Sequence, residues 1–217
     1  MTFISKIRVA KTSRVVDAEI YHCAYADMVD WDRHIHKPFI ARSGNIGSDW
    51  DWPAKFLGCQ FSELALGRNA IAFQIRVAND LSEAVPVAQA ILSYPYFWPG
   101  DKSDHCVFVW LIAATPVAAL QRFRVQDRFS TLPPLLDTAI QLSLRLGLEG
   151  RIALHAATGG SPEESDALMD KYRNQGLRQR SKLGAFFRFP FRPDDGRLFY
   201  FTPQDALAYA KKQDDLR

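Results

Sequence analysis

Two residues in the C-terminal half of the chain have side chains suited to proton transfer. Tyr172 lies in a segment with helical spacing, and a positioned phenol can donate a proton. His155 ends a short apolar stretch, where an imidazole could act as a base near neutral pH. A packing role is the alternative for each of them. We predict Tyr172 and His155 as the candidate catalytic residues.

A basic segment precedes a helix-like stretch at 132–146. Its arginines could bind the phosphates of an anionic ligand through charge-assisted hydrogen bonds, and the net charge of +3 agrees with such a ligand. Two hydroxyl residues follow shortly after the arginines. Solvent exposure without a ligand is the alternative for a basic loop. The predicted anion-binding residues are Arg122, Arg124, Arg128, Ser130 and Thr131.

Residues 30–53 combine aromatic, histidine and glycine residues without a regular period. We predict a long loop there, and connections of this length often have a functional role. Within it, His34 and His36 follow Asp32, and on a strand both imidazoles would lie on one face, as metal ligands do. No third ligand stands at a suitable spacing, so no metal site is predicted. The aromatic residues could form a small hydrophobic core or line a pocket.

The composition is that of a globular protein. Of the 217 residues, 47% are hydrophobic and 24% are charged, which allows a sizeable core. The three cysteines are far apart, so neither a disulfide framework nor a zinc knuckle is predicted. No apolar run reaches the roughly 18 residues of a membrane helix. We expect a cytoplasmic protein without membrane association, and the mild net charge does not indicate a nucleic-acid binder.

Hydrophobic periodicity and turn residues predict an alternation of strands and helices. The expected strands are 2–10, 70–77, 85–94, 106–114, 151–156, 185–190 and 197–201, with a turn at 79–82. The expected helices are 17–29, 132–146, 161–176 and one that begins at 202. Antiparallel strands followed by a β-α-β-α-β unit predict a single α/β domain, 1–217, with a mixed central sheet and helices on both faces.

The stretch 106–176 resembles the GNAT acyltransferase superfamily. The apolar strand 106–114 before a basic loop is similar to the central strand of that family. The sequence LPPLLDTAIQLSLRLGLEGRIALHA is similar to its cofactor-side helix and next strand. The segment SDALMDKYRNQGL resembles the family ending A-x-x-F-Y-x-x-x-G-F, with Tyr172 and Gly176 at matching positions.

This resemblance implies an acyl-CoA-dependent N-acyltransferase, which moves an acetyl group from acetyl-CoA to a small-molecule or peptide amine. It divides the chain into an acceptor-side half, 1–104, and an acyl-CoA-side half, 105–217. Tyr172 would protonate the departing thiolate, and the central strand would bind the pantetheine arm and the oxyanion. Related folds often pair through edge strands, which leaves a homodimer open. The central-strand residues implied are Ile112, Ala113 and Ala114.

The phosphate loop departs from the family pattern R/Q-x-x-G-x-G/A, because Asp127, Ser130 and Leu132 stand at its three defined positions. A shift by one residue places Arg128 at the basic position but adds no glycine. Side chains hinder the close approach of a phosphate to the backbone, and two prolines remove amide donors from the first helical turn. Either the arginines hold the cofactor differently, or a non-catalytic GNAT-fold protein binds a partner or another ligand.

Overall fold

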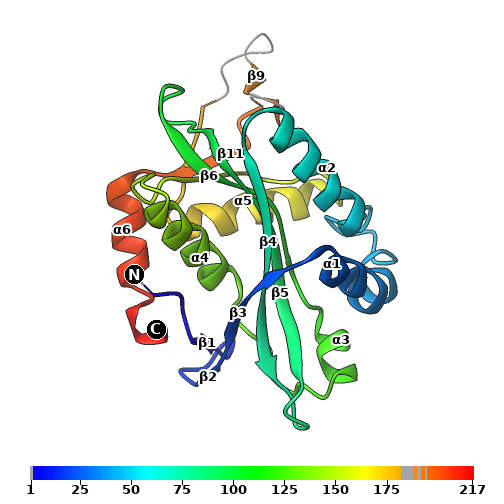
Figure 1. Ribbon diagram of the computed structural model, residues 1–217. Helices are drawn as coiled ribbons and strands as arrows, with labels where there is room; N and C mark the ends of the chain where they lie inside the picture. The colour runs from blue at the N-terminus through cyan, green and yellow to red at the C-terminus, as the bar shows by residue number, and fades with distance from the viewer. Residues whose placement is uncertain (1, 182–187, 190–191, 194) are drawn as a thin grey trace.

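A seven-stranded mixed sheet forms the centre of the computed structural model, which describes residues 2–181, 188–189, 192–193 and 195–217 (Figure 1). The strand order is β3-β4-β5-β6-β7-β11-β8. Neighbouring strands are antiparallel, except that β6 and β7 run parallel. The bounds are β3 Glu19–Cys23, β4 Asn69–Ala78, β5 Ala84–Phe97, β6 His105–Ala114, β7 Ile152–His155, β11 Leu198–Phe201 and β8 Arg178–Gln179.

Helices cover both faces of this sheet. Phe73 and Ile75 of β4 pack in one hydrophobic cluster with α4 and α6. Ala72 packs in a second cluster with α1, η1 and α2, because successive side chains of a strand point to opposite faces. The predicted class, a mixed sheet with helices on both faces, is confirmed. The helices are α1 Tyr25–Trp31, the π-helix η1 Asp32–Ile40, α2 Trp52–Ala65, α4 Leu132–Arg145, α5 Pro162–Asn174 and α6 Pro203–Lys211.

Most elements predicted after residue 70 are confirmed to within a few residues. Strands β4 to β7 and helices α4 to α6 occupy the expected ranges, although β5 continues three residues beyond the predicted end at 94. Asn79 closes the β4–β5 hairpin, since its Oδ1 accepts hydrogen bonds from Leu81 N and Glu83 N. Ser161 caps α5, because its hydroxyl accepts a hydrogen bond from Glu164 N at 3.3 Å.

The helix predicted at 17–29 is wrong, because two strands precede the helix in this region. β1 (Lys6–Arg8), shorter than the strand predicted at the N-terminus, pairs with β2 (Val15–Asp17) in a small separate sheet. β3 then forms the edge of the central sheet, and α1 begins only at Tyr25. The helical spacing of the apolar residues was misleading, because hydrogen bonds to β4 over the length of β3 decide the local structure.

The loop predicted at 30–53 is wrong for most of its length. The end of α1, all of η1 and the start of α2 lie within it, and only 41–51 is irregular. Pro38 lies inside η1, and a proline that cannot donate to the helical ladder accompanies this wider, irregular turn. His34 and His36 therefore stand on a helix and not on the strand that the metal hypothesis required.

Two further differences concern connections. The last predicted strand pair is wrong in its partner, since β11 pairs with β7 and β8, and most of 185–190 lies outside the described residues. The described residues near it include two short strands, β9 (Arg188–Phe189) and β10 (Arg192–Pro193), which pair with each other. The basic connection after β6 contains a short helix, α3 (Val117–Arg122).

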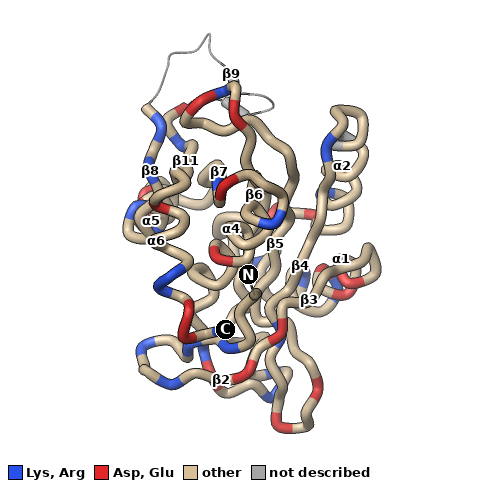
Figure 2. The backbone as a smooth tube through the Cα atoms, turned by 60° about the vertical axis from the view of Figure 1, so that its left-hand side comes forward, with Lys and Arg blue, Asp and Glu red and all other residues tan. Residues whose placement is uncertain are grey.

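Basic and acidic residues are interspersed along the chain in Figure 2.

The N-terminal and C-terminal segments lie side by side (Figures 1 and 2). Ser5 N donates to Leu216 O at 2.7 Å. Arg217 Nη2 contacts both carboxylate oxygens of Asp137 in α4, at 2.7 and 2.9 Å. Asp137 is fully buried, and this burial raises the pKa of its carboxyl although Arg217 acts to lower it. The buried carboxylate therefore depends on one guanidinium for compensation.

We expect Arg217→Ala to lower the free energy of unfolding by about 3 kcal/mol, because it leaves a buried carboxylate without its cation. Asp137→Asn in the same background should recover most of this loss, since no charge is then left buried. Urea unfolding at pH 7 measures both effects. A change below about 0.5 kcal/mol in the single variant, which is typical of a surface substitution, would contradict this role.

Candidate active site

The parallel strands β6 and β7 separate halfway along β6. Their register runs from Val107 opposite Ile152 to Val109 opposite Leu154 and ends there. On the other side, β6 remains paired with β5 as far as Ala114. The final residues of β6 therefore border a cavity on the side where β7 has ended. Backbone groups on such a strand edge are available to an extended ligand.

A β-bulge lies where the two strands separate. Val109 pairs with Leu92 and Leu111 with Ile91, which leaves Trp110 as the extra residue of β6. A bulge bends its strand and increases the local twist. Trp110 is fixed by a hydrogen bond from its Nε1 to Ser93 Oγ at 2.8 Å. The bulge therefore helps to turn the end of β6 away from β7.

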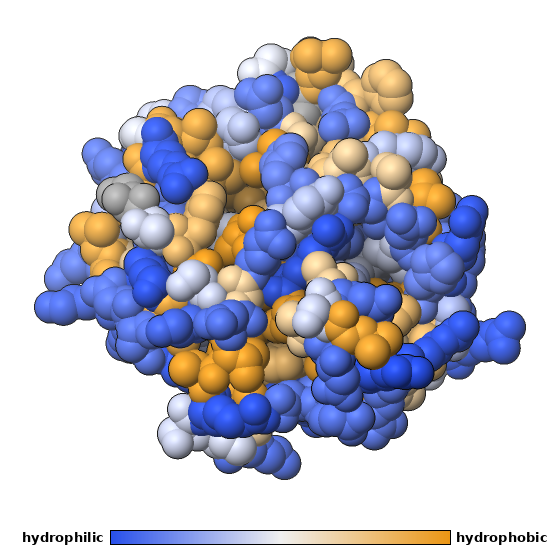
Figure 3. All heavy atoms as spheres, turned by 60° about the horizontal axis from the view of Figure 1, so that its bottom comes forward, coloured by the Kyte–Doolittle hydropathy of each residue, from blue (hydrophilic) through white to orange (hydrophobic). Residues whose placement is uncertain are grey.

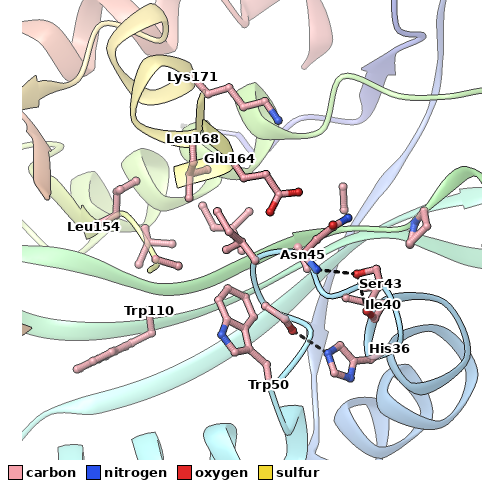
Figure 4. Close-up of a pocket in the computed structure, with 18 of the residues that line it drawn as sticks. His36, Ile40, Ser43, Asn45, Trp50, Trp110, Leu154, Glu164, Leu168 and Lys171 are labelled. Carbon is pink, nitrogen blue, oxygen red and sulfur yellow. Dashed lines mark hydrogen bonds between the residues drawn. The ribbon is translucent and has the colours of Figure 1, made fainter. Parts of the chain in front are cut away.

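The acceptor cavity, as we call the space beside this separation, has a volume of about 480 Å³. Three parts of the chain enclose it: the ends of β6 and β7, one face of α5, and the segment from η1 to the start of α2 (Figure 4). It brings together the predicted residues Tyr172, His155, Ile112, Ala113 and Ala114. Hydrophobic side chains are also visible in hollows between hydrophilic ones in Figure 3.

Tyr172 lies on α5 and lines the acceptor cavity. It is 7% exposed, and its ring lies 5.5 Å from that of Phe199 in β11, centroid to centroid. Burial raises the pKa of Tyr172 to about 12, against a smaller opposing effect of Arg197. The phenol is therefore protonated near neutral pH and can donate a proton or a hydrogen bond.

His155 is held by an acidic residue that the sequence analysis did not predict. Its Nε2 lies 3.0 Å from Asp195 Oδ1. A neutral imidazole that donates through Nε2 carries its lone pair on Nδ1. Arg197 N also donates to Asp195 Oδ1, at 3.0 Å, so this carboxylate has two partners that fix its place. The pair His155 and Asp195 can hold a proton at the end of β7.

A second cavity, the donor cavity, adjoins the first. It has a volume of about 490 Å³ and lies at the start of α4. Ile112, Leu168, Lys171 and Tyr172 are among the residues that line both cavities. The residues of the predicted anion-binding set that line the donor cavity are Arg128, Ser130 and Thr131.

The other two predicted arginines lie elsewhere. Arg122 is the last residue of α3, and Arg124 follows at a turn with φ of 59°. Both are exposed, and neither is among the described residues that line the two cavities. Arg122 ends the short helix α3, which was not predicted, and Arg124 lies two residues after it, so both precede the stretch 128–131 that borders the donor cavity.

The backbone of the predicted phosphate loop is largely engaged by the N-terminal segment. Ser130 N donates to Arg8 O at 3.0 Å, and Arg128 O accepts from Ala10 N at 2.6 Å. Pro133 and Pro134 have no N–H to offer in the first turn of α4. This loop therefore cannot present the row of free amides with which a helix N-terminus ordinarily binds a phosphate.

His36 supports the segment that closes the acceptor cavity. Its Nε2 lies 2.9 Å from Gly47 O, and its Nδ1 lies 3.4 Å from Asp32 Oδ1. Lys37 Nζ lies 2.7 Å from the other oxygen of Asp32, and the Asp32 hydrogen bond raises the pKa of Lys37. The partners of His36 are thus a carbonyl and a carboxylate. The described residues contain no group of three or more His, Cys, Asp or Glu side chains placed to hold a metal ion.

Two charged lining residues were not predicted as site residues. They are Glu164 in the first turn of α5 and Lys171 near the end of the same helix. Their spacing relative to Leu168 was the usable signal, because residues three or four positions apart share a helix face. Glu164 lies four residues before Leu168, and Lys171 and Tyr172 lie three and four residues after it. Glu164, Leu168, Lys171 and Tyr172 all line the acceptor cavity.

A mixed sheet whose central parallel pair separates beside a cavity is the arrangement of the GNAT acyltransferases, and the chain has this fold. No protein-family model and no curated protein sequence matches it. Among solved structures, a mutant of the toxin AtaT bound to the C-terminus of the antitoxin AtaR and acetyl-CoA is similar, with a TM-score of 0.52. The identity is 9%, over 89% of this chain and 98% of that one.

Two further solved structures are similar at lower scores. A mutant of the spermidine N-acetyltransferase SpeG from Vibrio cholerae has a TM-score of 0.49 and 14% identity, over 88% of this chain and 96% of that one. A mutant of KacT has a TM-score of 0.48 and 9% identity, over 88% and 98%. Separately, none of the helices in the described ranges has both the length and the hydrophobicity needed to cross a membrane.

The free energy of unfolding should fall less steeply with rising pH in Tyr172→Phe than in the unmodified protein. The pKa of Tyr172 is about 12 in the folded protein against 10.0 for the free side chain, so the unfolded chain loses this proton first. The buried phenol contributes about 2–3 kcal/mol to the free energy of unfolding. This contribution is complete below about pH 10 and disappears as the pH approaches 12. Urea unfolding of both proteins between about pH 8 and 11.5 measures the difference, and parallel curves would contradict this burial.

Proposed function

We propose that the protein is an acyl-CoA-dependent N-acyltransferase that transfers an acetyl group directly to an amine. The observation that carries the proposal is the acceptor cavity, where Tyr172 lies beside the edge of β6 at the point where β7 has ended. The acetyl-CoA in the AtaT structure of the same fold supports this choice of donor.

The two cavities fit the parts of acetyl-CoA unequally. The edge of β6 at Ile112–Ala114 suits the amide-bearing pantetheine arm, because it offers backbone donors and acceptors as a neighbouring strand would. The phosphates would instead meet side chains, since Ser130 N is engaged by Arg8. Arg128 and Lys171 both line the donor cavity, and no ion pair involves either of them among the described residues.

The donor supplies its acyl group as a reactive thioester, and the remaining tasks fall to this chain. A backbone N–H of β6 near Ile112–Ala114 would donate to the oxyanion that develops on the attacked carbonyl. His155, oriented by Asp195, would accept the proton that the amine loses. Tyr172 would give its phenolic proton to the departing thiolate, which its high pKa allows because the phenol is fully protonated near neutral pH.

The alternative is a GNAT-fold protein that binds a ligand or a partner without acetyl transfer. The engaged backbone at Ser130 and the two prolines of α4 favour it, because they remove the ordinary means of phosphate binding. The two proposals differ in one measurable property, the affinity for acetyl-CoA.

Acetyl-CoA should bind with a dissociation constant in the micromolar range, and Arg128→Ala or Lys171→Ala should weaken it about tenfold or more, as the loss of a charged hydrogen bond does. Isothermal titration calorimetry measures these affinities. Arg122→Ala is the matched control, because it removes the same charge from an exposed position outside both cavities. No heat at millimolar acetyl-CoA, with an intact circular dichroism spectrum, would leave only the alternative.

Tyr172→Phe should lower turnover by about a hundredfold or more, the range of a lost general acid, with little change in acetyl-CoA affinity. The reason is that the phenolic proton is needed only as the thiolate departs. Turnover is followed as release of free CoA thiol with a panel of amines, and affinity by calorimetry. Unchanged turnover in the variant would remove Tyr172 from this role.

A further inference from the structure

The acceptor cavity has one acidic side chain among the described residues that line it, Glu164. Glu164 is half-buried in the first turn of α5. Its Oε2 accepts a hydrogen bond from Ser161 N at 3.2 Å, and its own N–H donates to Ser161 Oγ. Figure 4 shows the carboxylate projecting from α5 toward the segment that carries Asn45 and Trp50. The helix cap therefore fixes a negative charge at the cavity.

The turn before α5 passes close to this carboxylate. Gly160 has φ of +66°, and a Cβ there would collide with Glu164 Oε2 and lie 3.3 Å from Ile46 Cγ1. Ile46 belongs to the segment that closes the cavity. The positive φ favours glycine at this position, and the carboxylate lies close to the closing segment.

Large aromatic side chains form part of the cavity wall. Phe39, Trp50 and Trp110 are half-buried residues that line the cavity. Trp50 packs edge-to-face against the fully buried Trp52, with ring centroids 5.9 Å apart, which gives this wall a rigid backing. Aromatic faces attract both apolar groups and cations. A carboxylate beside such a wall suits an ammonium group attached to a hydrophobic body.

The negative and positive side chains of the cavity lie at different positions along α5. Glu164 lies at one end, and Lys171 lies seven residues later at the junction with the donor cavity, about 10 Å further along the helix axis. A single ammonium near Glu164 is compensated and remote from Lys171. A ligand with several charges would leave cations near apolar walls or near Lys171, and buried unpaired charge is costly.

We propose that the cavity accepts a small amine with one positive charge on a hydrophobic, aromatic body, and that Glu164 binds its ammonium group. This amine would be the acceptor substrate of the proposed acyltransferase, and its role as a substrate rests on that proposed function. The binding itself requires no acyl donor. The volume of about 480 Å³ is within the range of small-molecule pockets.

The test compares three probes by isothermal titration calorimetry on the full chain at pH 7.5: 2-phenylethylamine, its neutral analogue 2-phenylethanol, and the polyamine spermidine. We expect 2-phenylethylamine to bind at least tenfold more tightly than either of the others. Glu164→Gln should weaken the amine about tenfold and leave the alcohol unchanged. Glutamine keeps the helix cap, so the variant removes only the charge.

Glu163→Gln is the matched control. It removes the same charge one residue earlier, from an exposed side chain that does not line the cavity, and should change amine affinity less than twofold. Equal losses in the two variants, an unchanged affinity in Glu164→Gln, tighter binding of spermidine, or no binding of the aromatic amine would each overturn the inference.

Failure of the two proposals can be told apart. If 2-phenylethylamine binds through Glu164 but is never acetylated, the proposed function fails and the assignment of the cavity stands. If spermidine is acetylated and 2-phenylethylamine is not, the acyltransferase stands and the acceptor class is overturned.

Discussion

The site depends on the end of hydrogen bonding between β6 and β7 at Val109 and Leu154. A continuous parallel pair would leave no space between the strands, because paired strands lie about 5 Å apart. Beyond this point β6 is held by β5 alone, and the bulge at Trp110 bends it at the place of separation. The acceptor cavity, the position of Tyr172 and the edge offered to an extended ligand all follow from that one interruption.

On the donor side the framework of the fold is kept, but side chains replace backbone amides as the groups that could bind phosphate. The N-terminal segment engages the loop before α4 through Ser130 N and Arg128 O, so that loop serves as a structural contact. Cationic side chains remain at the same place, Arg128 from the loop and Lys171 from α5. A flexible cation binds phosphate as a charge, whereas a row of amides also imposes shape. The affinity of this site for phosphate would therefore depend more strongly on salt concentration than the affinity of a row of amides.

Long periodic segments and strong caps were predictable from the sequence. The helix at Leu132–Arg145 has a clear apolar face, and Ser161 begins α5 with a hydroxyl and a proline. Edge strands were not predictable, because β3 has mixed burial and its hydrogen bonds come from β4. The helical nature of 30–53 was hidden for another reason. Its proline and polar residues resemble a loop, and burial of Trp31 and Ile35 against the sheet overrides that local preference.

The sequence by itself determined most of the elements after residue 70 and the class of the fold, and it singled out Tyr172 as a candidate. Only the tertiary structure decided which charged residues share the site. Asp195 joins His155 from 40 residues away, and Glu164 faces a wall built from a distant part of the chain. Arg122 and Arg124 lie at the end of a short helix and outside the donor cavity that Arg128 lines. The physical reason is that periodicity records burial along one element, whereas a site is made by contacts between elements, which depend on where strands end and helices turn.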